Sequence, residues 1–409
     1  MATLATRRLV LLAGVALPTA ALAQRRPGPA KPGAHGAHPA KPGETEATGS
    51  PADTPVGPVD TAARWAYVMD YNTDTTLLSK DADDQMPPSS MTKIMTAYIV
   101  YGMLKAKRLS FDQMLPVSDK AWRMGGSKMF VPQGGQVKVE DLIRGMIVQS
   151  GNDACIVLAE GIAGSEDAFV ELMNAKGRDM GLTNTTFKNC TGWPDAGHMS
   201  SARDIAKLAQ RIIQDFPEYY KYDSEKTFKF NNIEQGNRNT LVQKGLADGL
   251  KTGHTDAGGY GLVASAERNQ RRVILVVNGL TTMKQRTEEG ERMLEWAFRE
   301  FEDVKLFTVG DTVEQAPVWL GSEPTVPLVG GRDLVVTMPR NWRNNAKIHI
   351  EYASPIPAPV TRGSVLGKLV VSGQGVPSAS VDLLAGADVP RLGLPGRAIG
   401  VLAHMVTGA

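Results

Sequence analysis

The sequence has little cysteine, few aromatic residues and no strong excess of charge of either sign. Its 409 residues include two cysteines, 6% aromatic residues, and 45 basic against 43 acidic side chains. Two cysteines exclude a disulfide framework, and the charge balance leaves no global field for gathering nucleic acid. After residue 23, no run reaches the roughly eighteen apolar residues that would indicate a membrane-spanning helix. The composition is that of a globular protein with room for two or three domains.

The N-terminus has the pattern of a secretory signal. Arg7 and Arg8 precede an apolar run at residues 9–17, and Ala21-Leu22-Ala23 provides a small-residue cleavage site before Gln24. The adjacent arginines leave both general secretion and twin-arginine export open. We therefore expect a signal peptide at residues 1–23 and an exported protein.

A linker is predicted at residues 24–60. This stretch holds eight prolines, six glycines and almost no large apolar residue, which is typical of a semi-stiff, solvated spacer. His35 and His38 lie within it without other metal ligands nearby, so we interpret them as solvated side chains and expect no metal site.

Folded sequence is predicted to begin near Arg64. A hairpin comes first, a series of helices follows, and two further strands and a helix end the segment. The fold class expected for residues 61–302 is therefore α/β (α+β), with a helical subdomain and one antiparallel sheet built from both ends of the segment. The expected strands cover 65–69, 76–78, 261–266 and 272–278, and the main helices cover 139–148, 153–162, 168–180, 202–213 and 287–301.

Beyond this domain the pattern changes to short apolar strands separated by glycine and proline. Strands at 312–318, 334–338, 347–352 and 367–371 predict a small all-β domain at residues 303–390. Apolar residues at helical spacing then predict a short amphipathic tail at 391–409, with weak peripheral contact to a membrane.

The first motif that carries chemistry is Ser90-Met91-Thr92-Lys93, at the start of a helical pattern. Residues three apart share one face of a helix turn, so the hydroxyl and the amine lie together. A serine nucleophile needs a neighbouring base, and a desolvated lysine near a second cation can have its pKa lowered enough to serve. Alone, the motif is equally explained by a helix cap followed by a surface lysine.

Two further motifs contain complementary groups. Ser150-Gly151-Asn152 offers a hydroxyl and a carboxamide that can converge on one pocket, although a capping turn explains it equally well. Lys251-Thr252-Gly253 offers a second positive charge, a hydroxyl, and a glycine that lets another backbone approach the strand closely. Each is weak separately.

In this order and in these local structures, the three motifs resemble those of penicillin-binding proteins and active-site-serine β-lactamases. The sequence resembles most the low-molecular-mass D-alanyl-D-alanine carboxypeptidases of the serine peptidase S11 type, in segments 88–96, 149–155, 181–187 and 251–255. The resemblance implies a β-lactamase-like transpeptidase domain followed by a small β domain. It implies peptidoglycan stem peptides as substrates, β-lactams as covalent inhibitors, a periplasmic location and no cofactor.

The resemblance also assigns roles. Ser90 attacks the carbonyl between two D-alanines, Lys93 is its base, and Ser150 relays a proton to the departing D-alanine. The backbone amides of Ser90 and His254 match the oxyanion hole, and Arg286 matches the arginine that binds the terminal carboxylate. The implied substrate-binding residues are Asn152, Lys251, Thr252, Gly253, His254, Thr255, Arg286 and Arg238. A surface position remains the alternative for both arginines.

Three alternatives stay open at this stage. His198 could be the base of a Ser-His-Asp triad, although the lysine set already supplies every role and a loop-positioning role is favoured. A class A β-lactamase would need a glutamate-held water, and the nearest match to Glu-x-x-Leu-Asn, Glu171-Leu172-Met173-Asn174, is one residue short. A non-catalytic wall-binding module would not need an activated Ser90. For Cys155 and Cys190, two free thiols are favoured over a bridge.

Overall fold

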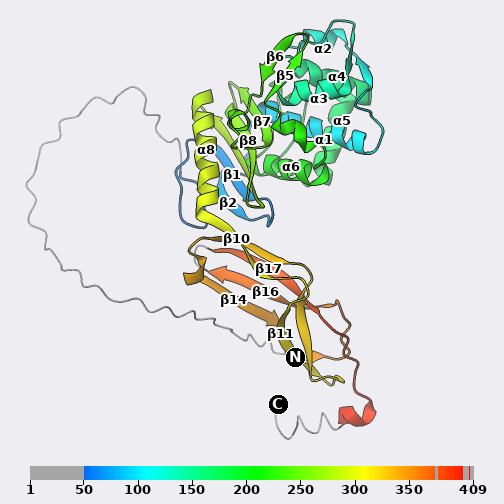
Figure 1. Cartoon of the computed structure of the whole chain (residues 1–409), viewed down its shortest axis with the longest axis vertical. Helices are drawn as coiled ribbons and strands as arrows, with labels where there is room; N and C mark the ends of the chain where they lie inside the picture. Colours follow the sequence, from blue (N-terminus) through cyan, green and yellow to red (C-terminus); the bar gives the residue numbers. More distant parts are fainter. Residues whose placement is uncertain (1–49, 374–375, 399–404, 406–409) are drawn as a thin grey trace, which may run out of the picture.

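The computed structural model of the chain describes residues 50–373, 376–398 and 405. It shows an α/β domain with a smaller β domain below it (Figure 1). The predicted signal peptide and most of the predicted linker lie outside the described residues, as does the tail at 399–404 and 406–409.

The first domain is built on a five-stranded antiparallel sheet with the order β2-β1-β9-β8-β7. Its first two strands come from the start of the domain and the other three from its end, so the predicted fold class is confirmed. β7, which carries the third motif, is an edge strand facing the helices (Figure 1). The strands are β1 (Trp65–Asp70), β2 (Thr76–Lys80), β7 (Gly249–Thr255), β8 (Gly259–Arg268) and β9 (Arg271–Leu280).

The continuous apolar run of β9 is explained by its burial on both faces. Ile274 and Val276 pack into the core shared with the helical subdomain. Val273, Leu275 and Val277 point the other way, into the core beneath α8 (Met283–Glu300). Because side chains alternate along a strand, β9 contributes apolar residues to both cores.

The helical subdomain contains most of the remaining helices. α6 begins after Ser201, whose side chain accepts a hydrogen bond from the Asp204 amide, and α8 begins after Thr282, which caps it in the same way. The prediction that the last helix starts at 287 was therefore wrong by one turn. The helices and short hairpins are η1 (Ser89–Thr92), α1 (Lys93–Lys105), α2 (Asp119–Arg123), α3 (Val139–Ile147), α4 (Asn152–Ala163), α5 (Glu166–Asp179), α6 (Ala202–Asp215), η2 (Tyr220–Ser224), α7 (Thr240–Lys244), β3 (Met114–Pro116) with β4 (Gln136–Lys138), and β5 (Thr227–Phe230) with β6 (Ile233–Gly236).

The end of the predicted linker belongs to the folded domain. Ala52 is fully buried and pairs with Val59, and Asp53 pairs with Ser79 in β2. The prediction that the linker extends to residue 60 was therefore wrong for this segment. The proline- and glycine-rich composition of this segment gave no indication that its end is ordered and packs on the domain through one small apolar side chain.

The second domain is all-β, and it begins at Phe301, directly after α8, rather than at 303. Its sheets have the orders β14-β16-β17-β12-β11-β15 and β10-β13. Four strands were predicted where the structure has eight, because several short pieces lack clear alternation. They are β10 (Phe301–Phe307), β11 (Thr312–Trp319), β12 (Thr325–Gly330), β13 (Leu334–Pro339), β14 (Ala346–Tyr352), β15 (Ile356–Pro357), β16 (Val365–Gly373) and β17 (Val376–Ala385).

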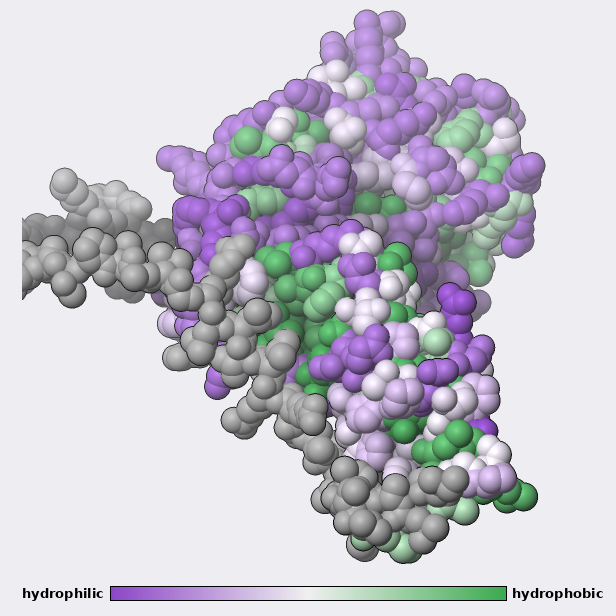
Figure 2. Space-filling model, turned by 60° about the horizontal axis from the view of Figure 1, so that its bottom comes forward, coloured by the Kyte–Doolittle hydropathy of each residue, from purple (hydrophilic) through white to green (hydrophobic). Residues whose placement is uncertain are grey.

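Polar contacts join the two domains. Asn72 donates to Asp303, and Thr73 shares a hydrogen bond of 2.5 Å with Thr337. The Arg271 guanidinium lies between Asp70 and Asp303, 2.8 and 3.3 Å from their carboxylates. In Figure 2 the first domain presents mainly hydrophilic residues, whereas hydrophobic residues gather over the β domain.

Candidate active site

Ser90 and Lys93 meet at the junction of η1 and α1. The Lys93 Nζ atom lies 2.8 Å from Ser90 Oγ, and the lysine is only 1% exposed. Nζ also contacts Asn152 Oδ1 at 2.7 Å and the Thr191 carbonyl at 2.6 Å. Burial lowers the pKa of Lys93. The predicted pairing of hydroxyl and amine is therefore present, on a 3₁₀ turn rather than inside an α-helix.

These contacts orient the lysine as a base. A neutral amine has two N–H donors and one lone pair. The two carbonyl oxygens of Asn152 and Thr191 can only accept, so they take the two donors. The lone pair is then directed at Ser90, whose hydroxyl can donate.

The backbone just before Ser90 has a strained conformation, and residues from distant parts of the sequence contact it. Ser89 has φ of 50°, and Gly192 has φ of 83°. A Cβ added at residue 192 would lie 1.8 Å from the Ser89 carbonyl oxygen, so only glycine permits this approach. Ser89 Oγ is in turn 2.9 Å from Thr255 Oγ1 on β7.

Ser150 and Lys251 form a second pair of hydroxyl and amine. Ser150 lies between α3 and α4 with φ of 65°, and Lys251 Nζ is 2.9 Å from its Oγ. Lys251 is buried, and desolvation followed by the charge of Lys93 holds its pKa well below the ordinary value. Two buried lysines are thus near enough for the charge of one to lower the pKa of the other, and each lies against one serine.

Asn152 has a structural task beyond the one predicted. Its Oδ1 binds Lys93, and its Nδ2 donates to the Gly125 carbonyl at 2.8 Å. One N–H of the carboxamide is left for a substrate amide. Its neighbour Asp153 was missed as a site residue. It accepts hydrogen bonds from the amides of Met129 and Phe130 and so fixes the loop that borders the pocket.

Gly253 allows β7 to approach the nucleophile. A Cβ added at this position would lie 3.0 Å from Ser89 Cβ and 3.3 Å from the Ser90 amide nitrogen. The close approach brings the strand carrying His254 against the segment carrying Ser90, as an oxyanion hole made from their two amides requires. Thr252 is buried beside them, whereas the His254 ring is exposed and packs on Tyr260, 3.9 Å between ring centroids.

Arg286 is buried, at 6% exposure, so the surface alternative for this residue was wrong. It lies in the first turn of α8, with Nη2 donating to the Arg238 carbonyl at 3.3 Å and its guanidinium 5.9 Å from the Tyr260 ring. Burial lowers its pKa. Among the described residues, no carboxylate lies within ion-pair distance of it. A buried cation lacking an anion is suited to receive one from a ligand.

Arg238 is exposed, and among the described residues the one hydrogen-bond acceptor of its side chain is Gln235, at 3.4 Å. Its backbone amide donates to the Val148 carbonyl, two residues before Ser150. The structure therefore places Arg238 at the rim, where its main chain rather than its side chain is fixed against the site.

His198 has no place in a triad. Its Nδ1 accepts from the Lys188 amide at 3.0 Å, so Nε2 carries the proton and donates to Thr92 Oγ1 at 2.8 Å. Burial lowers its pKa to about 4. His198 therefore holds η1 in place through a hydrogen bond, which agrees with the interpretation that it positions a loop.

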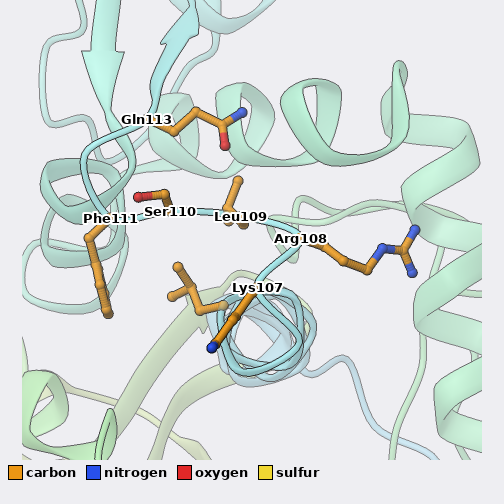
Figure 3. A pocket seen from close by; sticks show the side chains of 7 residues that line it. Lys107, Arg108, Leu109, Ser110, Phe111 and Gln113 are labelled. Carbon is orange, nitrogen blue, oxygen red and sulfur yellow. The ribbon is translucent and has the colours of Figure 1, made fainter.

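Other candidates lie away from the chemistry. Cys155 and Cys190 are free and buried. Glu171 and Asn174 lie within α5. Within the described ranges, no group of three or more metal-ligating side chains converges. A cavity of about 380 Å³ lies at the end of α1. Lys107 and Arg108 are among the residues that line it, and their side chains point away from each other (Figure 3).

Comparisons with known proteins agree with this arrangement. The sequence profile described as D-alanyl-D-alanine carboxypeptidase, peptidase S11, matches residues 51–282, and that of the penicillin-binding protein 5 C-terminal domain matches 301–391. The chain is 40% identical to D-alanyl-D-alanine carboxypeptidase DacC of Escherichia coli K12, over 82% of this chain and 86% of that protein. It is 40% identical to DacA of Haemophilus influenzae, over 84% and 89% respectively.

Solved structures show the same likeness. Penicillin-binding protein 5 from Haemophilus influenzae superposes with a TM-score of 0.75 at 39% identity, covering 82% of this chain and all of that chain. Penicillin-binding protein D2 from Listeria monocytogenes, in its ampicillin-bound form, has a TM-score of 0.53 at 30% identity and covers 58% of this chain and 97% of that one.

Proposed function

The chain belongs to the D-alanyl-D-alanine carboxypeptidase family of serine peptidases, and on that premise we propose how its residues remove the terminal D-alanine from peptidoglycan stem peptides. The observation that carries the proposal is the contact between Lys93 and Ser90. The lysine is buried, and its other two contacts are carbonyl acceptors. Ser90 is therefore the one partner to which its lone pair can turn.

Acylation begins when Lys93 Nζ takes the proton of Ser90 as Oγ forms a bond to the carbonyl between the two D-alanines. The carbonyl becomes a tetrahedral oxyanion, which the amides of Ser90 and His254 stabilise. Ser150, whose hydroxyl lies 2.9 Å from Lys251 Nζ, gives its proton to the nitrogen of the departing D-alanine and takes a replacement from the protonated Lys93, which is neutral again at the end of the step. The carbon–nitrogen bond breaks, leaving an ester on Ser90 and free D-alanine.

Deacylation uses water activated by the same lysine. Attack on the ester returns the proton to Ser90 and releases the shortened peptide, so the site is restored. The comparisons favour this activity over the β-lactamase and the non-catalytic alternatives. Glu171, the nearest candidate for a water-holding glutamate, is an exposed residue of α5, and among the described residues it makes no hydrogen bond to Ser90 or Lys93, so the extra base that fast lactam hydrolysis needs has no candidate there.

Selectivity for a free C-terminus is assigned to Arg286. The guanidinium has no anionic partner among the described residues, and its burial strengthens its attraction for a carboxylate. Thr255 on β7 lies beside the nucleophile segment, with its Oγ1 2.9 Å from Ser89 Oγ. An internal peptide bond would leave the buried cation unpaired, which disfavours it.

The proposal is tested by measuring D-alanine release from a synthetic stem pentapeptide. Wild-type protein is expected to release one D-alanine per peptide, and Ser90→Ala is expected to release none. Ser89→Ala keeps a serine at position 90 and serves as the neighbouring control, with activity retained in part. Release that persists in Ser90→Ala would contradict the proposal.

We also propose that the protein is exported to the periplasm and contacts the outer face of the cytoplasmic membrane. The signal-like N-terminus supports export, and the exposed side chains of Leu394 and Met405 support weak contact through the tail. Within the part of the chain that the structure describes, no helix is long and apolar enough to span a bilayer. Deleting residues 395–409 is expected to abolish salt-resistant membrane association. Equal fractionation of the two forms would show that the tail is no anchor.

A further inference from the structure

Trp193 lies at the edge of the active site with its indole ring against two consecutive glycines. The residue follows Gly192, which packs on the backbone before Ser90, and it is 46% exposed. A Cβ added to Gly125 would lie 3.2 Å from the indole ring, and one added to Gly126 would lie 3.1 Å from it. The ring therefore packs on the backbone of both glycines. None of the catalytic steps uses this side chain.

The turn that carries Trp193 also carries one of the two carbonyl acceptors of Lys93. The Oδ1 atom of Asn189 accepts hydrogen bonds from the amides of residues 191, 192 and 193, at distances between 2.8 and 3.2 Å. Its Nδ2 atom donates to the Trp193 carbonyl at 2.9 Å. The Thr191 carbonyl, in the same turn, lies 2.6 Å from Lys93 Nζ. One carboxamide thus fixes the indole relative to this acceptor.

The two glycines are bound to the other acceptor of Lys93. The Nδ2 atom of Asn152 donates to the Gly125 carbonyl at 2.8 Å, and its Oδ1 atom lies 2.7 Å from Lys93 Nζ. Gly126 has φ of 74°, and a Cβ added there would lie 2.8 Å from Asn152 Nδ2. The glycine segment is therefore held between the Asn152 carboxamide on one side and the Trp193 indole on the other.

These contacts form a closed ring around the amine of Lys93. The ring runs from Lys93 to Asn152, through the two glycines to Trp193, and through the turn back to the Thr191 carbonyl. If the indole were removed, the glycine segment would lose its outer support. Asn152 would then lose the partner that orients its carboxamide, and water could approach the amine.

Exclusion of water determines the charge of the amine. Burial is the largest cause of the lowered pKa of Lys93. Other titratable groups near the amine act in both directions, and they lie on every side of it: Lys251 on β7, Asp153 and Cys155 on α4, Cys190 beside the turn, and His198 behind η1.

We propose that Trp193 is a positioning residue for the catalytic base. Its indole presses the glycine segment against Asn152, and this keeps Lys93 shielded from water with its lone pair directed at Ser90. The inference rests on the proposed function, since it requires Lys93 to be the base for Ser90.

The test measures the rate at which benzylpenicillin acylates the protein between pH 6 and pH 9. Trp193→Ala should acylate about 10-fold more slowly at pH 7, less than the factor of roughly 10² to 10⁴ that a general base contributes. The difference from wild type should shrink as pH rises. Water that reaches Lys93 raises its pKa toward the ordinary value, so the amine becomes neutral only at higher pH.

A conservative variant and a matched control accompany this measurement. Trp193→Phe keeps a flat ring on the glycines and should restore most of the rate. Trp122→Ala removes another partly exposed tryptophan, 38% exposed at α2, and should behave as wild type. With a stem pentapeptide, Trp193→Ala should lower kcat and keep KM near the wild-type value, because Arg286 still holds the substrate carboxylate.

Gly126→Ala tests the same contact from the other side of the glycine segment. Its Cβ would separate the segment from Asn152, so it should reproduce the pH-dependent loss. This variant decides the matter by itself if thermal denaturation shows that Trp193→Ala does not fold.

The outcomes separate this inference from the proposed function. A wild-type rate in Trp193→Ala, or a loss of equal size at every pH, would overturn the positioning role and leave the carboxypeptidase activity intact. Failure of wild-type protein to be acylated or to release D-alanine would instead contradict the proposed function.

Discussion

The amine of Lys251 lies 2.9 Å from the hydroxyl of Ser150, repeating across the pocket the pairing of Lys93 with Ser90. Both lysines are buried, and the charge of Lys93 adds to desolvation in lowering the pKa of Lys251. Two such amines within one pocket disfavour simultaneous protonation. One can therefore accept a proton while the other keeps the pocket positive.

The first prediction identifies the nucleophile. Benzylpenicillin presents a strained amide where the D-Ala-D-Ala bond lies, so Ser90 should open it and retain one drug mass as an ester. Mass spectrometry of intact protein, followed by proteolysis, should place this mass on the peptide containing Ser90. The adduct should decay over minutes or longer, because no glutamate-held water assists its hydrolysis.

Two variants sharpen that measurement. Ser90→Ala should gain no mass, and Lys93→Ala should gain it far more slowly, because the hydroxyl remains without its base. Label on another serine, or undiminished labelling of Ser90→Ala, would remove the basis of the mechanism.

The second prediction concerns the carboxylate. Arg286→Ala should reduce D-alanine release by roughly 10² to 10³, equivalent to about 3 to 4 kcal/mol for a charge-assisted contact in a partly dry site. Lys284→Ala, which removes an exposed cation from the same turn of α8, is the control and should keep its activity. Near wild-type turnover by Arg286→Ala would transfer the role to Arg238 or Thr252.

The third prediction separates strain from steric conflict at Gly192. Gly192→Ala places a Cβ against the Ser89 carbonyl, so it should abolish acylation by displacing Ser90 and lower the free energy of unfolding. Gly134→Ala is the matched control: its φ is 67° and a Cβ there meets nothing within 4 Å. It should cost only the backbone term of about 1 to 2 kcal/mol. Thermal denaturation and penicillin labelling of both variants decide the point; equal effects would refute the steric argument.

The fourth prediction is a pH dependence of stability caused by Asp223. Burial, and then the charge of Asp248, raises the pKa of its carboxyl from 3.8 to about 8. Between these values the folded protein holds a proton that the unfolded chain has lost, so this group should make stability fall as pH rises from about 4 to 8.

Asp223→Asn removes that dependence. The variant should therefore gain more in melting temperature, relative to wild type, at pH 8 than at pH 5, because the cost to the native protein of keeping a proton that the unfolded chain has lost grows between these two pH values. Thermal unfolding at the two pH values provides the measurement. A difference that is the same at both would show that Asp223 titrates normally.

The sequence alone indicated the nucleophile, its base, the proton relay and the order of the three motifs, because the three motifs together resemble those of a known family, although each is weak separately. Only the pairing of Ser90 with Lys93 could also be inferred from spacing. Ser90 and Lys93 are three residues apart, and the turn that aligns them is local. The fold class followed for the same reason, since alternation in the strands and periodicity in the helices are local properties.

Tertiary structure decided what depends on distant segments. Arg286 is separated from Ser90 by almost two hundred residues, and only the packing of α8 beside β8 shows that it is buried. Asp153 accepts a hydrogen bond from a loop that lies elsewhere in the sequence. Gly192 is required only because the backbone of Ser89 packs against it. Burial, orphaned charge and close backbone approach are properties of surfaces brought together by folding, and no local pattern in the chain encodes them.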